Sequence, residues 1–257
     1  MQINYNKMKQ IQKPKPGTAN SSTSPNRGDK CIIEIKDLHK IYTETEVKVK
    51  AVNGISISFD KGEFTAIVGP SGCGKTTLLN LLGGLDAPTS GSVFIDETDI
   101  SSLSSKQMID FRLNNIGFVF QAYNLIPVLT AKENAEFIMQ LQNRSKEERK
   151  SRIAELFRAI GIEGKENVKP GRLSGGQQQR VAVARALASK PKFILADEPT
   201  ANLDSKATAE LLDIMHELNL QENITFIFAT HDQRVIDRAE RVVLLEDGKV
   251  IKDTLKS

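Results

Sequence analysis

The sequence has little of what marks several large classes of protein. Only two of its 257 residues are cysteines, Cys31 and Cys73, and they lie far apart. Because Cys73 also lies within a glycine-rich loop, we expect that the two cysteines form no structural disulfide and that the protein works in a reducing compartment. No apolar run approaches the roughly 18 residues that a membrane-spanning helix needs. The formal net charge is only +3, so charge gives no signal for a nucleic-acid partner.

Polar residues dominate the first part of the chain. Residues 1–29 are rich in Pro, Ser, Thr, Asn and Lys, which predicts a disordered tail. No apolar segment follows its basic residues, so we do not expect a secretory signal. A second interpretation is that its lysines contact anionic lipid headgroups, namely Lys7, Lys9, Lys13 and Lys15. We expect residues 30–257 to form one folded domain.

Apolar stretches bounded by turn residues predict strands and helices within that domain. Strands are expected at 31–38, 55–59, 64–68, 91–96, 116–121, 193–196 and 225–229. Helices are expected at 76–85, 130–142, 146–160 and 207–218, and also directly after Ser174. A hairpin with Asp247 and Gly248 at its turn is expected near the end. The mixture indicates an α/β fold with a helical insert at about 122–173.

The most informative stretch is IVGPSGCGKTTLLN, which fits the spacing G-x-x-x-x-G-K-[ST]. Its loop comprises Gly69, Pro70, Ser71, Gly72, Cys73, Gly74, Lys75, Thr76 and Thr77. Glycines let the backbone wrap a polyphosphate, and consecutive N–H groups at a helix start then face the anion. We expect Lys75 near the β- and γ-phosphates and the Thr76 hydroxyl on Mg²⁺. The sequence therefore predicts an ATP and Mg²⁺ site.

A pair of carboxylates ends a second apolar strand, in FILADEPT. If this strand runs beside the phosphate-loop strand, Asp197 lies near Mg²⁺ and Glu198 lies next to the γ-phosphate. A carboxylate there can orient or deprotonate the attacking water. Glu198 is therefore the expected catalytic carboxylate.

A third stretch, LSGGQQQRVAVARAL, begins a helix. Ser174 is expected to cap that helix, while Gly175 and Gly176 expose its first N–H groups. These residues predict a second anion-binding feature about 100 positions after the first.

Together with ILADEP and the later THD, these motifs closely resemble the ATP-binding subunit of ATP-binding-cassette (ABC) transporters. The resemblance covers roughly residues 31–252. It implies the fold of an ABC-type P-loop NTPase. Such a fold has a mixed central sheet, an N-terminal antiparallel β-subdomain and an α-helical insert.

The resemblance also implies roles for single residues. Tyr42 is similar to the aromatic residue that stacks on adenine, although it could be an ordinary half-buried tyrosine. Gln121 resembles the glutamine that touches Mg²⁺ and the attacking water. His231 resembles the histidine that contacts the γ-phosphate. With Lys75 and Glu198, Gln121 and His231 complete the expected catalytic set.

Two further features of the family act between subunits. The signature resembles one that closes on the γ-phosphate of the opposite subunit, through Ser174, Gly175, Gly176 and Gln177. Asp204 resembles the loop residue that links the two sites, and it could also start the following helix. The resemblance thus implies a homodimer in the ATP-bound state.

Four strings narrow the resemblance, namely LLNLLGGLDAPTSG, GFVFQAYNLIPVLTAKEN, LSGGQQQRVAVARAL and ADEPTANLD. They are similar to one subgroup, which serves lipoprotein release, macrolide-type efflux and peptide-antibiotic resistance. That similarity implies a separate membrane permease, attachment to the cytoplasmic face of the inner or plasma membrane through it, and no nucleic acid. Tyr123, Leu125 and Ile126 are candidate permease contacts, although they could pack inside the insert. An importer subunit or a soluble ABC ATPase without a transport role remains an alternative.

Overall fold

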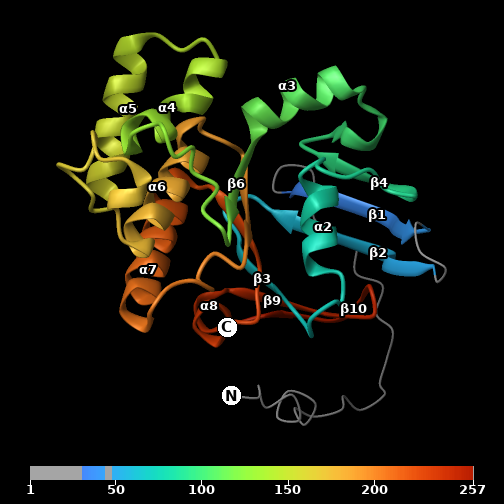
Figure 1. Cartoon of the computed structure of the whole chain (residues 1–257). Helices are drawn as coiled ribbons and strands as arrows, with labels where there is room; N and C mark the ends of the chain where they lie inside the picture. Colours follow the sequence, from blue (N-terminus) through green and yellow to red (C-terminus); the bar gives the residue numbers. More distant parts are fainter. Residues whose placement is uncertain (1–30, 44–47, 257) are drawn as a thin grey trace.

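A six-stranded mixed sheet forms the centre of the computed structural model, which describes residues 31–43 and 48–256 (Figure 1). The strand order is β10-β9-β3-β8-β7-β6. Five strands run parallel: β3 (Phe64–Val68), β6 (Ile116–Phe120), β7 (Phe193–Asp197), β8 (Thr225–Ala229) and β9 (Arg241–Glu246). The hairpin partner β10 (Lys249–Leu255) pairs antiparallel with β9. The predicted tail, residues 1–29, lies outside the described residues.

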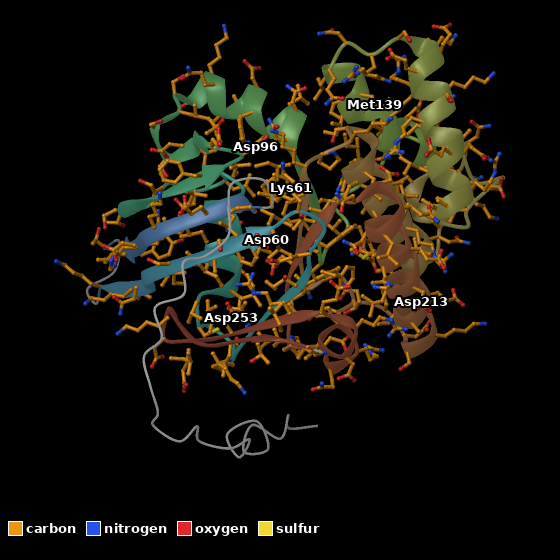
Figure 2. The ribbon with its side chains drawn as sticks, turned by 180° about the vertical axis from the view of Figure 1, so that it is seen from behind. Asp60, Lys61, Asp96, Met139, Asp213 and Asp253 are labelled. Atoms are coloured by element: carbon orange, nitrogen blue, oxygen red, sulfur yellow. The ribbon has the colours of Figure 1, made fainter. Side chains whose placement is uncertain are left out.

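A four-stranded antiparallel sheet covers one side of the central sheet. Its order is β2 (Val49–Asp60), β1 (Cys31–Tyr42), β4 (Ser90–Ile95) and β5 (Thr98–Asp99). The helix α2 (Lys75–Leu82) packs with this sheet and the central one in a shared apolar core. Lys61 and Lys192 both pair with Asp96, which ties the two sheets together. Figure 2 labels Lys61 and Asp96.

Helices lie on the other side of the central sheet (Figure 1). They are α4 (Ala131–Leu141), α5 (Lys146–Ala159), α6 (Gly175–Ala188) and α7 (Ser205–Glu222), with a 3₁₀ turn at Pro170–Arg172. Of these, α6 and α7 are next to the strands, and α4 and α5 pack on α6. Phe157, Leu212 and Phe226 belong to the core on this side and are fully buried. α4 and α5 lie where the helical insert was predicted. Its exact boundaries, and those of the tail, stay predictions.

Two helices have no counterpart among the expected elements, namely α3 (Ser105–Asn115) and α8 (Gln233–Arg238). None of the residues of α3 is fully buried, so its apolar residues form no strong helical stripe. Its start is fixed locally instead, because Ser104 and Gln107 form a reciprocal capping box. The same reciprocal bonds join Ser174 to Gln177 at the start of α6, which confirms the predicted cap.

The register of the parallel strands positions the loops that follow them. Ile67 pairs with Ala229, and Ala229 pairs with Asp197, so these residues form one row across β3, β8 and β7. The chain leaves all three strands at the same edge of the sheet. Among the described residues, no helix is both long and apolar enough to cross a membrane.

One buried ion pair joins α5 to the end of α7. The Arg152 side chain is only 5% exposed and donates to both carboxylate oxygens of Glu222, at 2.9 and 2.7 Å. Its Nη2 also donates to the Leu187 carbonyl of α6 at 3.0 Å. One guanidinium therefore links three helices of the face that carries the signature.

We expect Arg152→Ala to lower the free energy of unfolding by about 2–3 kcal/mol, because it removes these charged hydrogen bonds and leaves Glu222 unpaired. Urea denaturation followed by circular dichroism measures the change. The matched control is Arg158→Ala, also on α5, whose partner Glu163 is solvent-exposed. An equal loss in both variants would contradict a special contribution from Arg152.

Candidate functional site

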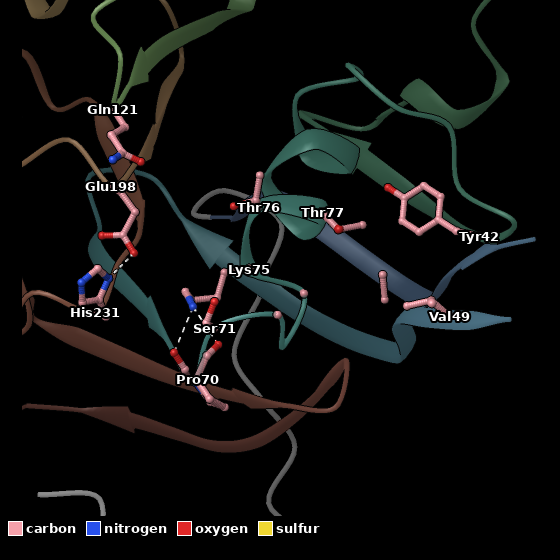
Figure 3. A pocket seen from close by; sticks show the side chains of 14 residues that line it. Tyr42, Val49, Pro70, Ser71, Lys75, Thr76, Thr77, Gln121, Glu198 and His231 are labelled. Atoms are coloured by element: carbon pink, nitrogen blue, oxygen red, sulfur yellow. Dashed lines mark hydrogen bonds and ion pairs between the residues drawn. The ribbon is translucent and has the colours of Figure 1, made fainter. Parts of the chain in front are cut away.

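The phosphate loop forms part of the wall of a cavity of about 730 Å³ (Figure 3). Its lining residues are Tyr42, Val49, Ala51, Gly69, Pro70, Ser71, Gly72, Gly74, Lys75, Thr76, Thr77, Gln121, Glu198 and His231. These residues come from six separate parts of the chain. The parallel strands and β1–β2 bring the residues together, so the site depends on the whole fold.

Close backbone contacts explain two glycines of the loop. At Gly69, an added Cβ would lie 2.2 Å from the Leu245 carbonyl oxygen, and at Gly74 it would lie 2.1 Å from the Ala51 carbonyl oxygen. Gly74 also has a φ of 104°, which side chains disfavour. The loop is thus pressed against β9 and β2, so that its open side faces the cavity.

Lys75 lies across the inside of the loop. Its Nζ donates to the carbonyls of Gly69 at 2.9 Å and Pro70 at 3.0 Å, and the residue is buried. Cys73 is also buried, on the core side of the loop, and it does not line the cavity. The ammonium group is therefore held where the loop closes around an anion.

Thr76 and Asp197 meet as the sequence predicts. The Thr76 hydroxyl donates to Asp197 Oδ1 at 3.2 Å across 121 positions of sequence. Burial raises the pKa of Asp197, and the adjacent Glu198 carboxylate raises it further. A cation would relieve both effects, and a hydroxyl with a carboxylate supplies the hard oxygen ligands that Mg²⁺ prefers. The residues present therefore fit Mg²⁺.

Glu198 and His231 form a close pair (Figure 3). Glu198 Oε1 lies 2.6 Å from His231 Nδ1, and the Thr230 hydroxyl donates to Glu198 Oε2 at 3.0 Å. Glu198 has a φ of +45° and donates its backbone N–H to the Ala229 carbonyl. Such a conformation is costly for a side chain and is common at functional sites. It turns the carboxylate from the strand end toward the cavity.

Tyr42 lines the cavity and is anchored at its hydroxyl. That hydroxyl donates to Asp86 at 2.8 Å, while the Lys40 ammonium bonds the same carboxylate and lies 4.9 Å from the tyrosine ring centre. Burial raises the pKa of Tyr42, and its bond to Asp86 raises it further. The ring is thus fixed at one end of the cavity, as an aromatic platform requires.

The signature residues do not line this cavity. Ser174 is exposed at the start of α6, and it accepts a bond from the Gln177 N–H at 3.3 Å. Asp204 caps α7 by accepting from the Ala207 N–H at 2.8 Å, as its alternative interpretation proposed. Within one chain, the second anion-binding feature is therefore separate from the first.

Some residues at the site escaped the sequence reasoning. Val49 and Ala51 contribute apolar surface from β2. Asp86 follows Tyr42 by 44 positions, and no local pattern indicates their contact. Thr230 directly precedes His231 in the THD motif, so the sequence itself places this hydroxyl next to the histidine.

Comparison with known proteins agrees with this geometry. The sequence profile of the ABC transporter family matches residues 52–201. "Macrolide export ATP-binding/permease protein MacB" from Mannheimia succiniciproducens is 45% identical over 225 residues, 88% of this chain but 35% of that protein. The chain therefore spans about a third of that relative. The ABC transporter ATP-binding protein MJ0796 from Methanocaldococcus jannaschii is 43% identical and matches 86% of this chain and 96% of its own length.

Solved structures show the same fold. A dimeric, post-hydrolysis structure of the MJ0796 cassette with ADP and Pi has a TM-score of 0.81 at 42% identity, covering 87% of this chain and 98% of the other. CbiO1 from Clostridium perfringens, part of the cbiONQ transporter complex, has a TM-score of 0.80 at 30% identity, covering 88% and 89%. The chain therefore belongs to the ABC transporter family, as an ATP-binding domain that hydrolyses ATP and is related to the MacB and MJ0796 types.

Proposed function

We propose that this ATPase drives a separate membrane permease of the type that serves lipoprotein release, macrolide efflux or resistance to antimicrobial peptides. The observation that carries the proposal is that one chain holds the parts of the ATP site in two separate places. The phosphate loop and the hydrolytic residues share one cavity, whereas the signature lies outside it. A macrolide-export relative at 45% identity supports this transporter type over an importer.

In this proposal, the phosphate loop holds the nucleotide. Lys75 exchanges its bonds to the Gly69 and Pro70 carbonyls for phosphate oxygens. Thr76 and Asp197 would hold Mg²⁺, which would supply positive charge beside the phosphates. Tyr42 stacks on the adenine at the other end of the cavity.

Hydrolysis then requires a water molecule beside the γ-phosphate. Glu198 orients that water and accepts its proton, and Gln121, which lies beside Glu198 in the cavity, contacts the same water (Figure 3). His231 holds one oxygen of Glu198 in place and faces the γ-phosphate, while Thr230 holds the other. The carboxylate is therefore oriented before the substrate arrives, which reduces the entropic cost of catalysis.

A second copy of the chain completes each site. Ser174, Gly175 and Gly176 offer the first N–H groups of α6 to the γ-phosphate bound by the opposite subunit, and Asp204 lies at the boundary between the two sites. Two ATP molecules thus hold the homodimer closed, and hydrolysis opens it. The dimeric state of the MJ0796 cassette supports this arrangement.

A groove of about 450 Å³ provides a docking site for the permease. Its apolar walls include Leu113 near the end of α3 and Phe137 and Ile138 on α4. Of the candidate contact residues, Ile126 lines the groove and is 37% exposed, whereas Leu125 packs against the core. An amphipathic helix at the cytoplasmic face of the permease fits such a groove.

The charges in the groove indicate what that helix carries. Arg112 and Arg185 both line it, and neither pairs with a carboxylate among the described residues. Their partners are the carbonyls of Gly84, Tyr123 and Asn124. Burial lowers the pKa of Arg185, so a carboxylate on the docked helix would stabilise its charge. We therefore expect an acidic residue on the permease helix.

Glu198→Gln should abolish most ATP turnover, reducing kcat about 100-fold or more, because the water loses its base. ATP binding should persist, and the chain should elute as a dimer with Mg-ATP in size-exclusion chromatography with light scattering. Glu217→Gln, an exposed site on α7, is the matched control and should keep normal turnover. A Glu198→Gln protein that stays monomeric at saturating ATP would contradict the proposed cycle.

Ile138→Asp should reduce the fraction of the chain that sediments with membranes of the producing cells, because it puts a charge in the apolar groove. The control is Leu141→Asp, one turn later on α4, which is exposed but does not line the groove. Both isolated variants should keep their ATPase activity. Equal membrane recovery of the two variants would show that the permease docks elsewhere.

A further inference from the structure

A buried glutamine on α6, the helix that begins with the signature, contacts the backbone next to two of the proposed catalytic residues. Gln179 of α6 is fully buried. Its side-chain Nε2 donates to the Pro199 carbonyl at 2.7 Å and to the Phe120 carbonyl at 3.4 Å. Both acceptors are carbonyls, so the amide nitrogen must face them.

The two carbonyls belong to the residues next to the proposed catalytic groups. Phe120 ends β6 and directly precedes Gln121, and Pro199 directly follows Glu198. A second amide also bridges these loops, because Asn202 Nδ2 donates to the Gln121 carbonyl at 2.9 Å. The loop that contains Gln121 and the loop after Glu198 are therefore joined at two points, one buried and one exposed.

The Gln179 amide is not satisfied at its other end. Its Oε1 is buried and has no donor among the described residues. A buried acceptor without a donor is unfavourable, and an apolar side chain would avoid it. What an apolar side chain cannot supply is two N–H bonds from one nitrogen to two different loops.

We propose that Gln179 is a positioning residue for hydrolysis, which fixes the spacing between Gln121 and Glu198 and ties both to the helix that begins at Ser174. Contact between Ser174 and the partner's nucleotide then acts through α6 on the two groups that flank the attacking water. This inference rests on the proposed role of Glu198. It adds a link between the signature of one site and the catalytic residues of the same chain.

The chain contains a close structural control. Asn219 on α7 is also a buried amide, 2% exposed, and its Nδ2 donates to two backbone carbonyls, Gly62 at 2.8 Å and Ile224 at 2.7 Å. Gly62 and Ile224 precede β3 and β8, so this amide lies at the opposite end of the strands from the cavity. Loss of the Asn219 bonds should affect stability alone.

The experiment compares Gln179→Met with Asn219→Leu, each an apolar replacement of similar shape. Phosphate release gives kcat and KM, a fluorescent ATP analogue gives the dissociation constant, and calorimetry gives Tm. We expect both variants to have a lower Tm. Only Gln179→Met should lose kcat, by about 10- to 100-fold, with an unchanged dissociation constant, because a displaced catalytic group impairs turnover rather than binding.

A second variant keeps the test decisive if Gln179→Met does not fold. Gln179→Glu preserves the shape but can donate only one hydrogen bond, and only while its carboxyl is protonated. Its activity relative to the unaltered protein should therefore fall as pH rises, since the ionised form faces two carbonyls without a proton.

Two results would overturn the inference: a kcat for Gln179→Met no lower than that of Asn219→Leu, or a relative activity of Gln179→Glu independent of pH. Glu198→Gln is measured alongside. If Glu198→Gln retains full turnover, the proposed role of Glu198 is wrong. If it loses turnover while Gln179→Met does not, only the positioning role fails.

Discussion

The hydrogen-bonded row that joins Ile67, Ala229 and Asp197 is the constraint on which the site depends. It aligns the ends of β3, β8 and β7, so the phosphate loop, Thr230 with His231, and Asp197 with Glu198 all leave the sheet at one edge. A shift of one residue in either strand pair would separate Thr76 from Asp197 and turn alternate side chains to the opposite face. Fully buried apolar residues on both faces of these strands hold the register.

The same sheet explains why one chain has only half of each proposed site. α6 packs on the face of the central sheet opposite to α2. The phosphate loop leads into α2, so Ser174 and Lys75 begin helices on different faces. Ser174 accordingly does not line the cavity that contains Lys75. Dimerisation is thus the simplest way to use both anion-binding features, and ATP is then part of the interface that it stabilises.

The sequence predicted those features of the site that depend on a few adjacent residues. The phosphate loop, the strand that ends at Asp197 and the cap at Ser174 each follow from a few adjacent residues. α3 was missed because it buries none of its residues fully and so has no clear apolar stripe. The anchoring of Tyr42 by Asp86 and the bridge from Gln179 to Phe120 and Pro199 join distant positions, and only the folded chain shows them.

Complementation between two inactive chains tests the shared site most directly. Lys75→Ala removes the ammonium group that binds the phosphates but leaves the signature intact. Ser174→Asp keeps a helix cap, but its carboxylate repels the γ-phosphate. Neither protein should hydrolyse ATP alone. An equimolar mixture should regain activity, because each mixed dimer has one site with an intact loop and an intact opposing signature. No recovery at any mixing ratio, or full activity of Ser174→Asp alone, would contradict the account.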